Sequence, residues 1–267
     1  DQDDMMLMVS RDISEPLIKR LSMFILRSRV TLANVDSDYA LLGLVGKDAV
    51  LAQALSVTLP DVGGIVHHPK GVLLRLPDVQ GRCRVLWQIP MSAALQKGES
   101  GALSTWLNAS LAQHPRPVIA PEIALPVWHA LEIHSGVPRI TLATQDQFVP
   151  QMINFEVVGG VNFKKGCYPG QEIVARSQYR GTIKRRLQLA YVESDVKVMA
   201  GMPLFHSDDP GQPCGMVVNA AQTGIARYDV LVETKLAALA SGTVHLHDVT
   251  GPALTFLSLP YSLPMAE

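Results

Sequence analysis

Cys167 and the charged residues around it are the part of the sequence best suited to chemistry. Residues 164–172 read Lys-Lys-Gly-Cys-Tyr-Pro-Gly-Gln-Glu, which places this cysteine between a lysine pair and a tight turn. Neighbouring cations lower the pKa of a thiol and a turn can hold it at the surface, so a reactive thiolate is one of two interpretations of equal weight. The alternative is a small buried side chain that fills the core. Nothing in the sequence shows which histidine, if any, lies near the thiol, so no catalytic dyad is predicted.

The remaining cysteines and the histidines indicate no metal centre. Cys83 and Cys214 are far from Cys167 in the sequence, and no Cys-x-x-Cys pair occurs. We therefore expect neither a disulfide framework nor a set of zinc or cluster ligands, and no stably bound metal. His245 and His247 would share one face of a strand, where a solvated strand face is the default explanation and a weak metal site the alternative. The odd number of cysteines fits a reducing compartment.

A basic segment begins at the cysteine motif and covers residues 164–186. It contains seven Lys or Arg residues and one acid, a local charge of +6 in a chain whose net charge is −1. In a helix, Glu172 and Arg176 form a favourable pair, whereas Arg176 and Arg180 repel each other. The segment is either a solvated helix face or a binding site for a carboxylate-rich ligand or nucleic-acid phosphates. The net charge of the whole chain argues against a generally basic nucleic-acid binder.

The elements that position these residues can be predicted from apolar periodicity and turn residues. Before the motif, the pattern predicts strands at 5–10, 29–34, 39–45, 72–76 and 83–89, and helices at 14–28 and 47–55. Residues 100–121 are predicted to form a helix followed by a Pro-rich connection, and residues 121–136 a helix that Pro126 kinks or restarts. This alternation predicts a ferredoxin-like unit. After Arg186, short apolar stretches separated by turns predict a small β-barrel or sandwich. The 267 residues, 48% of them hydrophobic and with no bilayer-length apolar run, predict an α+β protein without a membrane segment.

Trp128 is the aromatic residue best placed to hold a flat ligand. It lies in the predicted 121–136 helix, on the same side as Leu125 and Leu131. Its large ring could stack on a heteroaromatic ligand, although a tryptophan in such a place more often belongs to the core.

Residues 136–187 resemble the signature region of the YgfZ family, the folate-binding relatives of the glycine-cleavage T-protein. The motif Lys-Gly-Cys-Tyr-x-Gly-Gln-Glu followed by Val-Ala-Arg carries this resemblance and is highly specific. The terminal Leu-Ser-Leu-Pro-Tyr-Ser-Leu, residues 257–263, is also similar to the ending of that family. The resemblance is strong between residues 128 and 186 and faint through residues 1–120.

The resemblance implies a cytoplasmic protein that binds polyglutamylated tetrahydrofolate, or a one-carbon derivative of it, in the middle of a three-domain, T-protein-like ring. Such proteins support assembly or repair of iron–sulfur clusters in client enzymes, including one that thiomethylates tRNA. By this resemblance Cys167 is the functional thiol, and Trp128, Arg176 and Arg180 contact folate. The other motif positions are Lys165, Gly166, Tyr168, Gly170, Gln171 and Glu172.

We therefore expect three regions: a ferredoxin-like domain at 1–115, a folate-facing segment at 116–186 and a β-barrel-like domain at 187–267. Members of the family usually carry about 80 further residues before this starting point, so we expect that an N-terminal part is missing.

Two other functions stay open. The T-protein holds the pterin edge with an acidic residue, whereas residues 78–90 offer arginines and no glutamate. Aminomethyl transfer or demethylation is therefore a weaker hypothesis than the accessory role. Because it is not excluded, the sequence leaves open whether the chain is an enzyme. A third alternative is docking of tRNA or protein on the basic segment. The net charge of the whole chain does not favour direct nucleic-acid binding.

Overall fold

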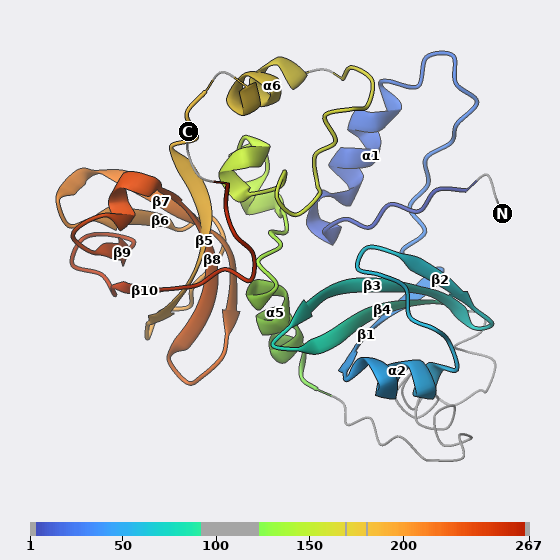
Figure 1. The fold of residues 1–267 in the computed structure, drawn as a ribbon. Coiled ribbons are helices and arrows are strands. Elements are labelled where there is room, and N and C mark those ends of the chain that lie inside the picture. The colour runs from blue at the N-terminus through green and yellow to red at the C-terminus, as the bar shows by residue number, and fades with distance from the viewer. Residues whose placement is uncertain (1–3, 92–122, 169, 180, 265–267) are drawn as a thin grey trace. The chain divides into compact units, whose positions relative to one another are not determined.

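The computed structural model describes residues 4–91, 123–168, 170–179 and 181–264. The chain divides into two compact units: unit 1 comprises Asp1–Leu21 and Leu125–Glu267, and unit 2 comprises Ser22–Ala124. Each unit contains both helix and sheet (Figure 1), so the α+β prediction is confirmed. The predicted boundaries at residues 115 and 186 stay a prediction. The helix expected at 100–121 lies outside the described residues.

Unit 2 is built on a four-stranded antiparallel sheet with the strand order β1-β4-β3-β2. Its elements are β1 (Tyr39–Gly46), α2 (Asp48–Leu55), β2 (Ile65–His68), β3 (Gly71–Val79) and β4 (Arg82–Pro90). Helix α2 buries Leu51 and Leu55 against Val85 and Trp87 of β4. Strands β3 and β4 form a hairpin across Gln80 and Gly81, which both have positive φ. Such a two-residue turn matches the natural twist of paired strands.

Two strands of the predicted ferredoxin-like unit do not form in the described residues, and the unit itself stays a prediction. Residues 5–10 and 29–34, expected to be two of its strands, contain no strand, and most of their side chains are exposed. Alternating apolar residues are not sufficient for a strand, because its backbone groups need a neighbouring strand for hydrogen bonding. No described strand pairs with either segment.

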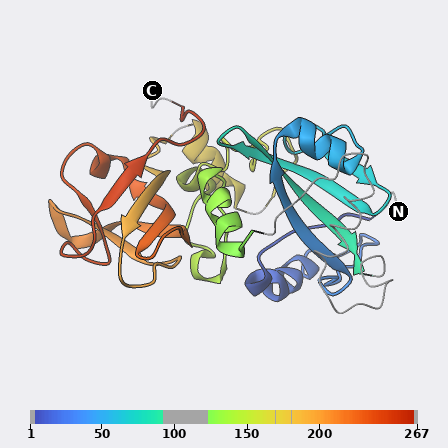
Figure 2. The ribbon, with the colours of Figure 1, turned by 90° about the horizontal axis from the view of Figure 1, so that it is seen from below.

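Unit 1 contains a six-stranded antiparallel sheet with the order β10-β5-β8-β7-β6-β9. Its strands are β5 (Arg185–Glu193), β6 (Pro203–His206), β7 (Asp209–Gln222), β8 (Arg227–Lys235), β9 (Val244–Leu246) and β10 (Leu254–Leu257). The sheet is curled (Figure 2), and a bridge between His245 and Ala253 joins its two edges at one point. The β-rich C-terminal region predicted after Arg186 is thus confirmed as a curled, barrel-like sheet.

The helices of unit 1 precede this sheet in the sequence. They are η1 (Arg11–Ile13), α1 (Ser14–Ser22), α5 (Leu125–His134), η2 (Leu142–Thr144), η3 (Pro150–Ile153) and α6 (Gln171–Tyr179), and η4 (Leu236–Leu239) follows β8. Helix α1 ends six residues before the predicted end at 28. Pro126 lies in the first turn of α5, where a missing N–H costs nothing, so it starts the helix and does not kink it. One face of α5 packs on the sheet, with Ile133 buried against Val218 and Leu231.

The C-terminal segment belongs to the core of unit 1. The Tyr261 hydroxyl donates a hydrogen bond to the Gly136 carbonyl at 2.7 Å and accepts one from Asn154 Nδ2 at 3.3 Å. Gly136 ends the α5 turn with φ +68°, and a Cβ there would lie 2.7 Å from the Tyr261 ring. Only glycine fits both the left-handed backbone and this contact. Within the described ranges, no helix is long and apolar enough to cross a bilayer.

Candidate functional site around helix α6

The cysteine motif forms an exposed loop that leads into helix α6. The Asn162 side chain accepts a hydrogen bond from the Lys164 N–H at 2.8 Å, and the Gln171 side chain accepts one from the Tyr168 N–H at 3.3 Å. Gly170, the residue before the helix, has φ +85°, which glycine adopts without strain. These local bonds close the loop and present Cys167 to solvent.

The three cysteines differ sharply in environment. Cys167 is exposed, whereas Cys83 lies in the core of unit 2 and Cys214 in the core of unit 1. Burial raises the pKa of the Cys83 thiol to about 11, and burial also raises the pKa of Cys214. The exposure required of a reactive thiol is therefore found at Cys167 alone among the three cysteines. Its functional role stays a prediction.

Helix α6 is fixed to unit 1 by one buried residue on its inner face and by a side chain beneath it. Val174 is buried, and its carbonyl accepts a hydrogen bond from the fully buried Gln151 at 2.8 Å. Gln151 belongs to η3, whose last residue Ile153 packs on β5 and β8 through Leu187 and Leu231. The helix that follows the cysteine loop is therefore held by the same core that holds the sheet.

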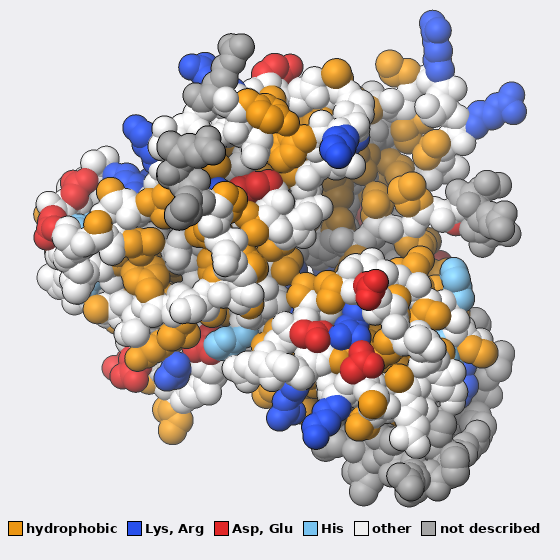
Figure 3. Space-filling model, in the orientation of Figure 1, with side chains coloured by type: hydrophobic (Ala, Val, Ile, Leu, Met, Phe, Trp, Pro, Cys, Tyr) orange, Lys and Arg blue, Asp and Glu red, His pale blue; other side chains and the backbone are white. Residues whose placement is uncertain are grey.

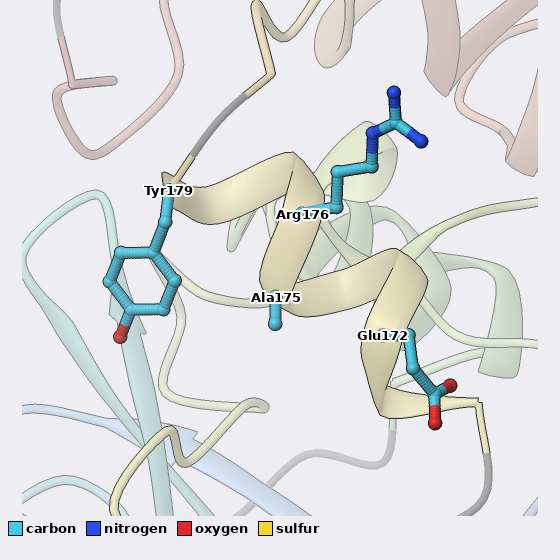
Figure 4. A pocket seen from close by; sticks show the side chains of 4 residues that line it. All are labelled: Glu172, Ala175, Arg176 and Tyr179. Atoms are coloured by element: carbon cyan, nitrogen blue, oxygen red, sulfur yellow. The ribbon is translucent and has the colours of Figure 1, made fainter.

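One face of α6 borders a depression lined, among the described residues, by Glu172, Ala175, Arg176 and Tyr179. Figure 4 shows Glu172, Ala175 and Tyr179 extending to one side of the helix, while the Arg176 side chain extends in another direction. The favourable Glu172–Arg176 pair expected from the sequence does not form. In the described part of the chain Arg176 has no ion-pair partner. The depression thus offers a carboxylate, an aromatic ring and an unpaired guanidinium along about two helical turns.

The structure separates the cations of the basic segment into two groups. Arg185 donates to both oxygens of buried Glu233 at 2.8 Å, and Arg186 pairs with buried Glu156 and donates to the Gln151 carbonyl at 3.1 Å. These two arginines are structural. A second group is exposed and makes no ion pair within the described ranges: Lys164, Lys165, Arg176 and Lys184.

Two residues that the resemblance assigns to folate contact, Trp128 and Arg180, are not among the residues that line the depression in the described part of the chain. Trp128 lies on α5 and is partly buried, and it does not belong to the described lining. Arg180 lies outside the described residues. Their assignment to folate contact stays a prediction.

Sequence reasoning missed two aromatic residues at this site. Phe163 and Tyr179 make an edge-to-face contact, with ring centroids 6.0 Å apart, that links the cysteine loop to the end of α6. Tyr179 is seven residues after Glu172, a spacing that places both on one helix face and could have revealed it. Phe163 lies in a loop, so its contact depends on tertiary structure.

Within the described ranges, no group of three His, Cys, Asp or Glu side chains is arranged to hold a metal ion. Fold and site define an α+β protein with a curled antiparallel sheet and an exposed cysteine in the loop before helix α6. No family model matches the sequence.

The sequence is nevertheless clearly similar to individual named proteins. The chain is 33% identical over 261 residues to the tRNA-modifying protein YgfZ of Photorhabdus laumondii, covering 95% of this chain and 72% of that protein. It is 29% identical over 266 residues to the protein of that name from Sodalis glossinidius, covering 98% and 75%. The corresponding protein of Klebsiella pneumoniae is 30% identical over 266 residues, with 95% and 72% covered. The chain belongs to the YgfZ family.

Proposed function

We propose that the chain is a tetrahydrofolate-binding accessory protein that supports assembly or repair of iron–sulfur clusters in client enzymes, including enzymes that thiomethylate tRNA. We place it in the cytoplasm and its folate in the centre of a T-protein-like ring. The observation that carries the proposal is the exposure of Cys167 in a loop that runs directly into α6 and its depression. The relatives named tRNA-modifying protein support the connection to tRNA modification.

The residues at the depression fit the chemistry of folate. A pterin presents neighbouring N–H donors at one edge, and Glu172 offers a carboxylate acceptor. A glutamate tail is anionic, and Arg176 is a guanidinium with no acidic partner among the described residues. Tyr179 adds an aromatic face to the same lining. The glutamate that residues 78–90 lack is thus available from another part of the chain.

Folate binding is tested by titrating tetrahydrofolate with one or several glutamates into the purified protein and following tryptophan fluorescence. Arg176→Gln should weaken binding of the polyglutamylated form by about tenfold, as expected for a lost charge-assisted hydrogen bond. The affinity for the one-glutamate form should decrease less. The matched control is Lys197→Gln, because Lys197 is exposed beyond the far end of β5 from α6. If neither the one-glutamate nor the polyglutamylated form quenches the fluorescence in a saturable way, the folate part of the proposal is refuted.

The thiol role is tested by complementation of a strain that lacks the gene, with activity of an iron–sulfur enzyme as the readout. Cys167→Ala and Cys167→Ser should both fail to restore activity at normal protein abundance. Full restoration by either variant would show that the thiol is dispensable, and folate binding would then be judged on the titration alone.

A further inference from the structure

Two aromatic rings at the end of α6 are exposed although they touch each other. Phe163 has 38% and Tyr179 71% of its surface exposed, and their edge-to-face contact leaves ring faces open to solvent. Large apolar rings gain free energy from burial, so their exposure in a pair calls for a partner that covers them. Figure 3 shows apolar side chains exposed over the part of the molecule that contains α6.

Lysines follow both of these aromatic residues closely in the sequence. Lys164 and Lys165 directly follow Phe163 in the loop, and Lys184 is five residues after Tyr179. All three are exposed and make no ion pair in the described part of the chain. The ammonium of Lys165 lies 4.3 Å from the centroid of the Tyr168 ring. Lysines and aromatic residues are therefore neighbours in this part of the sequence.

We propose that Phe163, Tyr179 and the neighbouring lysines form a binding surface for single-stranded RNA. Every nucleobase has a π-face that can stack on an exposed aromatic ring, and lysines along the same stretch can neutralise the phosphates. Such binding needs no high net charge on the whole protein, since the lysines are close to the aromatic residues in the sequence. The inference goes beyond the proposed function, because it requires neither folate nor the Cys167 thiol.

The aromatic pair is what favours RNA over an acidic protein segment. A row of carboxylates would use the lysines and Arg176 but would leave the rings of Phe163 and Tyr179 uncovered. A duplex would use the lysines as well, but its bases are stacked internally and cannot cover an aromatic ring. A single strand satisfies both kinds of group together.

The test measures fluorescence anisotropy of a labelled oligouridine with the purified protein in the absence of folate, over a series of salt concentrations. With three or four phosphate contacts, log K should fall with log salt with a slope of about −2 to −3, since each contact on a single strand contributes about −0.7. Lys164→Gln should reduce the slope by about 0.7. Lys197→Gln, the distant exposed lysine, should leave both affinity and slope unchanged.

The rings are tested separately from the charges. Tyr179→Leu should weaken oligouridine binding at least about fivefold without changing the slope, and Tyr179→Phe, which keeps the ring, should retain it. A slope change without any effect of Tyr179→Leu, or equal binding of polyglutamate or duplex RNA, would overturn the inference in favour of a plain cationic surface. Absence of binding at low salt would overturn it outright. Tetrahydrofolate titration of the same preparation is scored independently, so failure here leaves the proposed function standing.

Discussion

Glu156 and Arg186 form an ion pair inside unit 1, with less than a tenth of either side chain exposed. Arg186 is the second residue of β5, and Glu156 lies shortly after η3, so the pair joins the sheet to the segment beneath α6. Arg186 also donates to the Gln151 carbonyl. One of the cations that gave the sequence its basic character is therefore committed to the core.

Removing one partner of this pair should destabilise unit 1 strongly. Glu156→Gln leaves the buried guanidinium without a counter-charge, and we expect a loss of about 3 kcal/mol in the free energy of unfolding measured in urea. Glu172→Gln, which removes an exposed carboxylate, should change stability by less than about 0.5 kcal/mol. Equal effects of the two substitutions would contradict the buried pair.

Asp229 should make stability sensitive to acid. It is buried, and its Oδ2 lies 2.7 Å from His134 Nε2. Burial raises the pKa of Asp229, but the hydrogen bond and charge of His134, with bonds from Arg227 and Thr223, outweigh this and lower the pKa below its ordinary value of 3.8. A carboxylate with a lowered pKa stabilises the fold above its ordinary pKa and loses this contribution as pH falls through the folded-state value, below about pH 4.

Asp229→Asn should accordingly reduce the free energy of unfolding at neutral pH by about 2 kcal/mol. It should also make the decrease in stability below about pH 4 less steep. Urea unfolding at a series of pH values measures both effects. Asp195→Asn is the control, because Asp195 is exposed on a turn of the same unit. If the Asp229 variant loses stability below about pH 4 as steeply as the unchanged protein does, other groups cause the acid sensitivity.

The cysteines should differ in their rate of alkylation. At neutral pH, iodoacetamide should modify Cys167 well before Cys83 and Cys214, because Cys167 is exposed and burial raises the pKa of the other two thiols. Mass spectrometry of peptides sampled over time gives the three rates. Bound tetrahydrofolate should slow the Cys167 reaction if the thiol borders the folate site. If Cys167 reacts slowest, it has no role as a presented thiol.

Gly136 should not tolerate a side chain. Gly136→Ala introduces a Cβ 2.7 Å from the Tyr261 ring at φ +68°, and the backbone strain alone costs about 1–2 kcal/mol. Thermal unfolding should show a lowered Tm. Gly159→Ala is a partial control, since Gly159 has a similar φ of +79° but no neighbouring atom within 4 Å of a Cβ. Gly159→Ala should therefore lose less stability than Gly136→Ala, and the difference is the cost of the contact between the Gly136→Ala Cβ and the Tyr261 ring.

The sequence by itself determined the local elements and the residues of interest. Its periodicity located α2, β1, β3, β4 and the β-rich region after Arg186, because burial of one face imposes a fixed spacing on apolar residues. The cysteine motif and the charge of the basic segment were equally visible, since both depend on neighbouring residues. Residues 5–10 and 29–34 were misassigned as strands, because a strand depends on a partner that spacing cannot supply.

Only the tertiary structure decided which charged residues are free. Arg185 and Arg186 look like Lys184 in the sequence, yet Glu233 and Glu156, distant in sequence, neutralise both. Likewise Phe163 meets Tyr179 only because the loop folds back on α6. Charge and ring contacts between distant segments depend on how the chain packs, and a local sequence pattern carries no information about the partner that packing supplies.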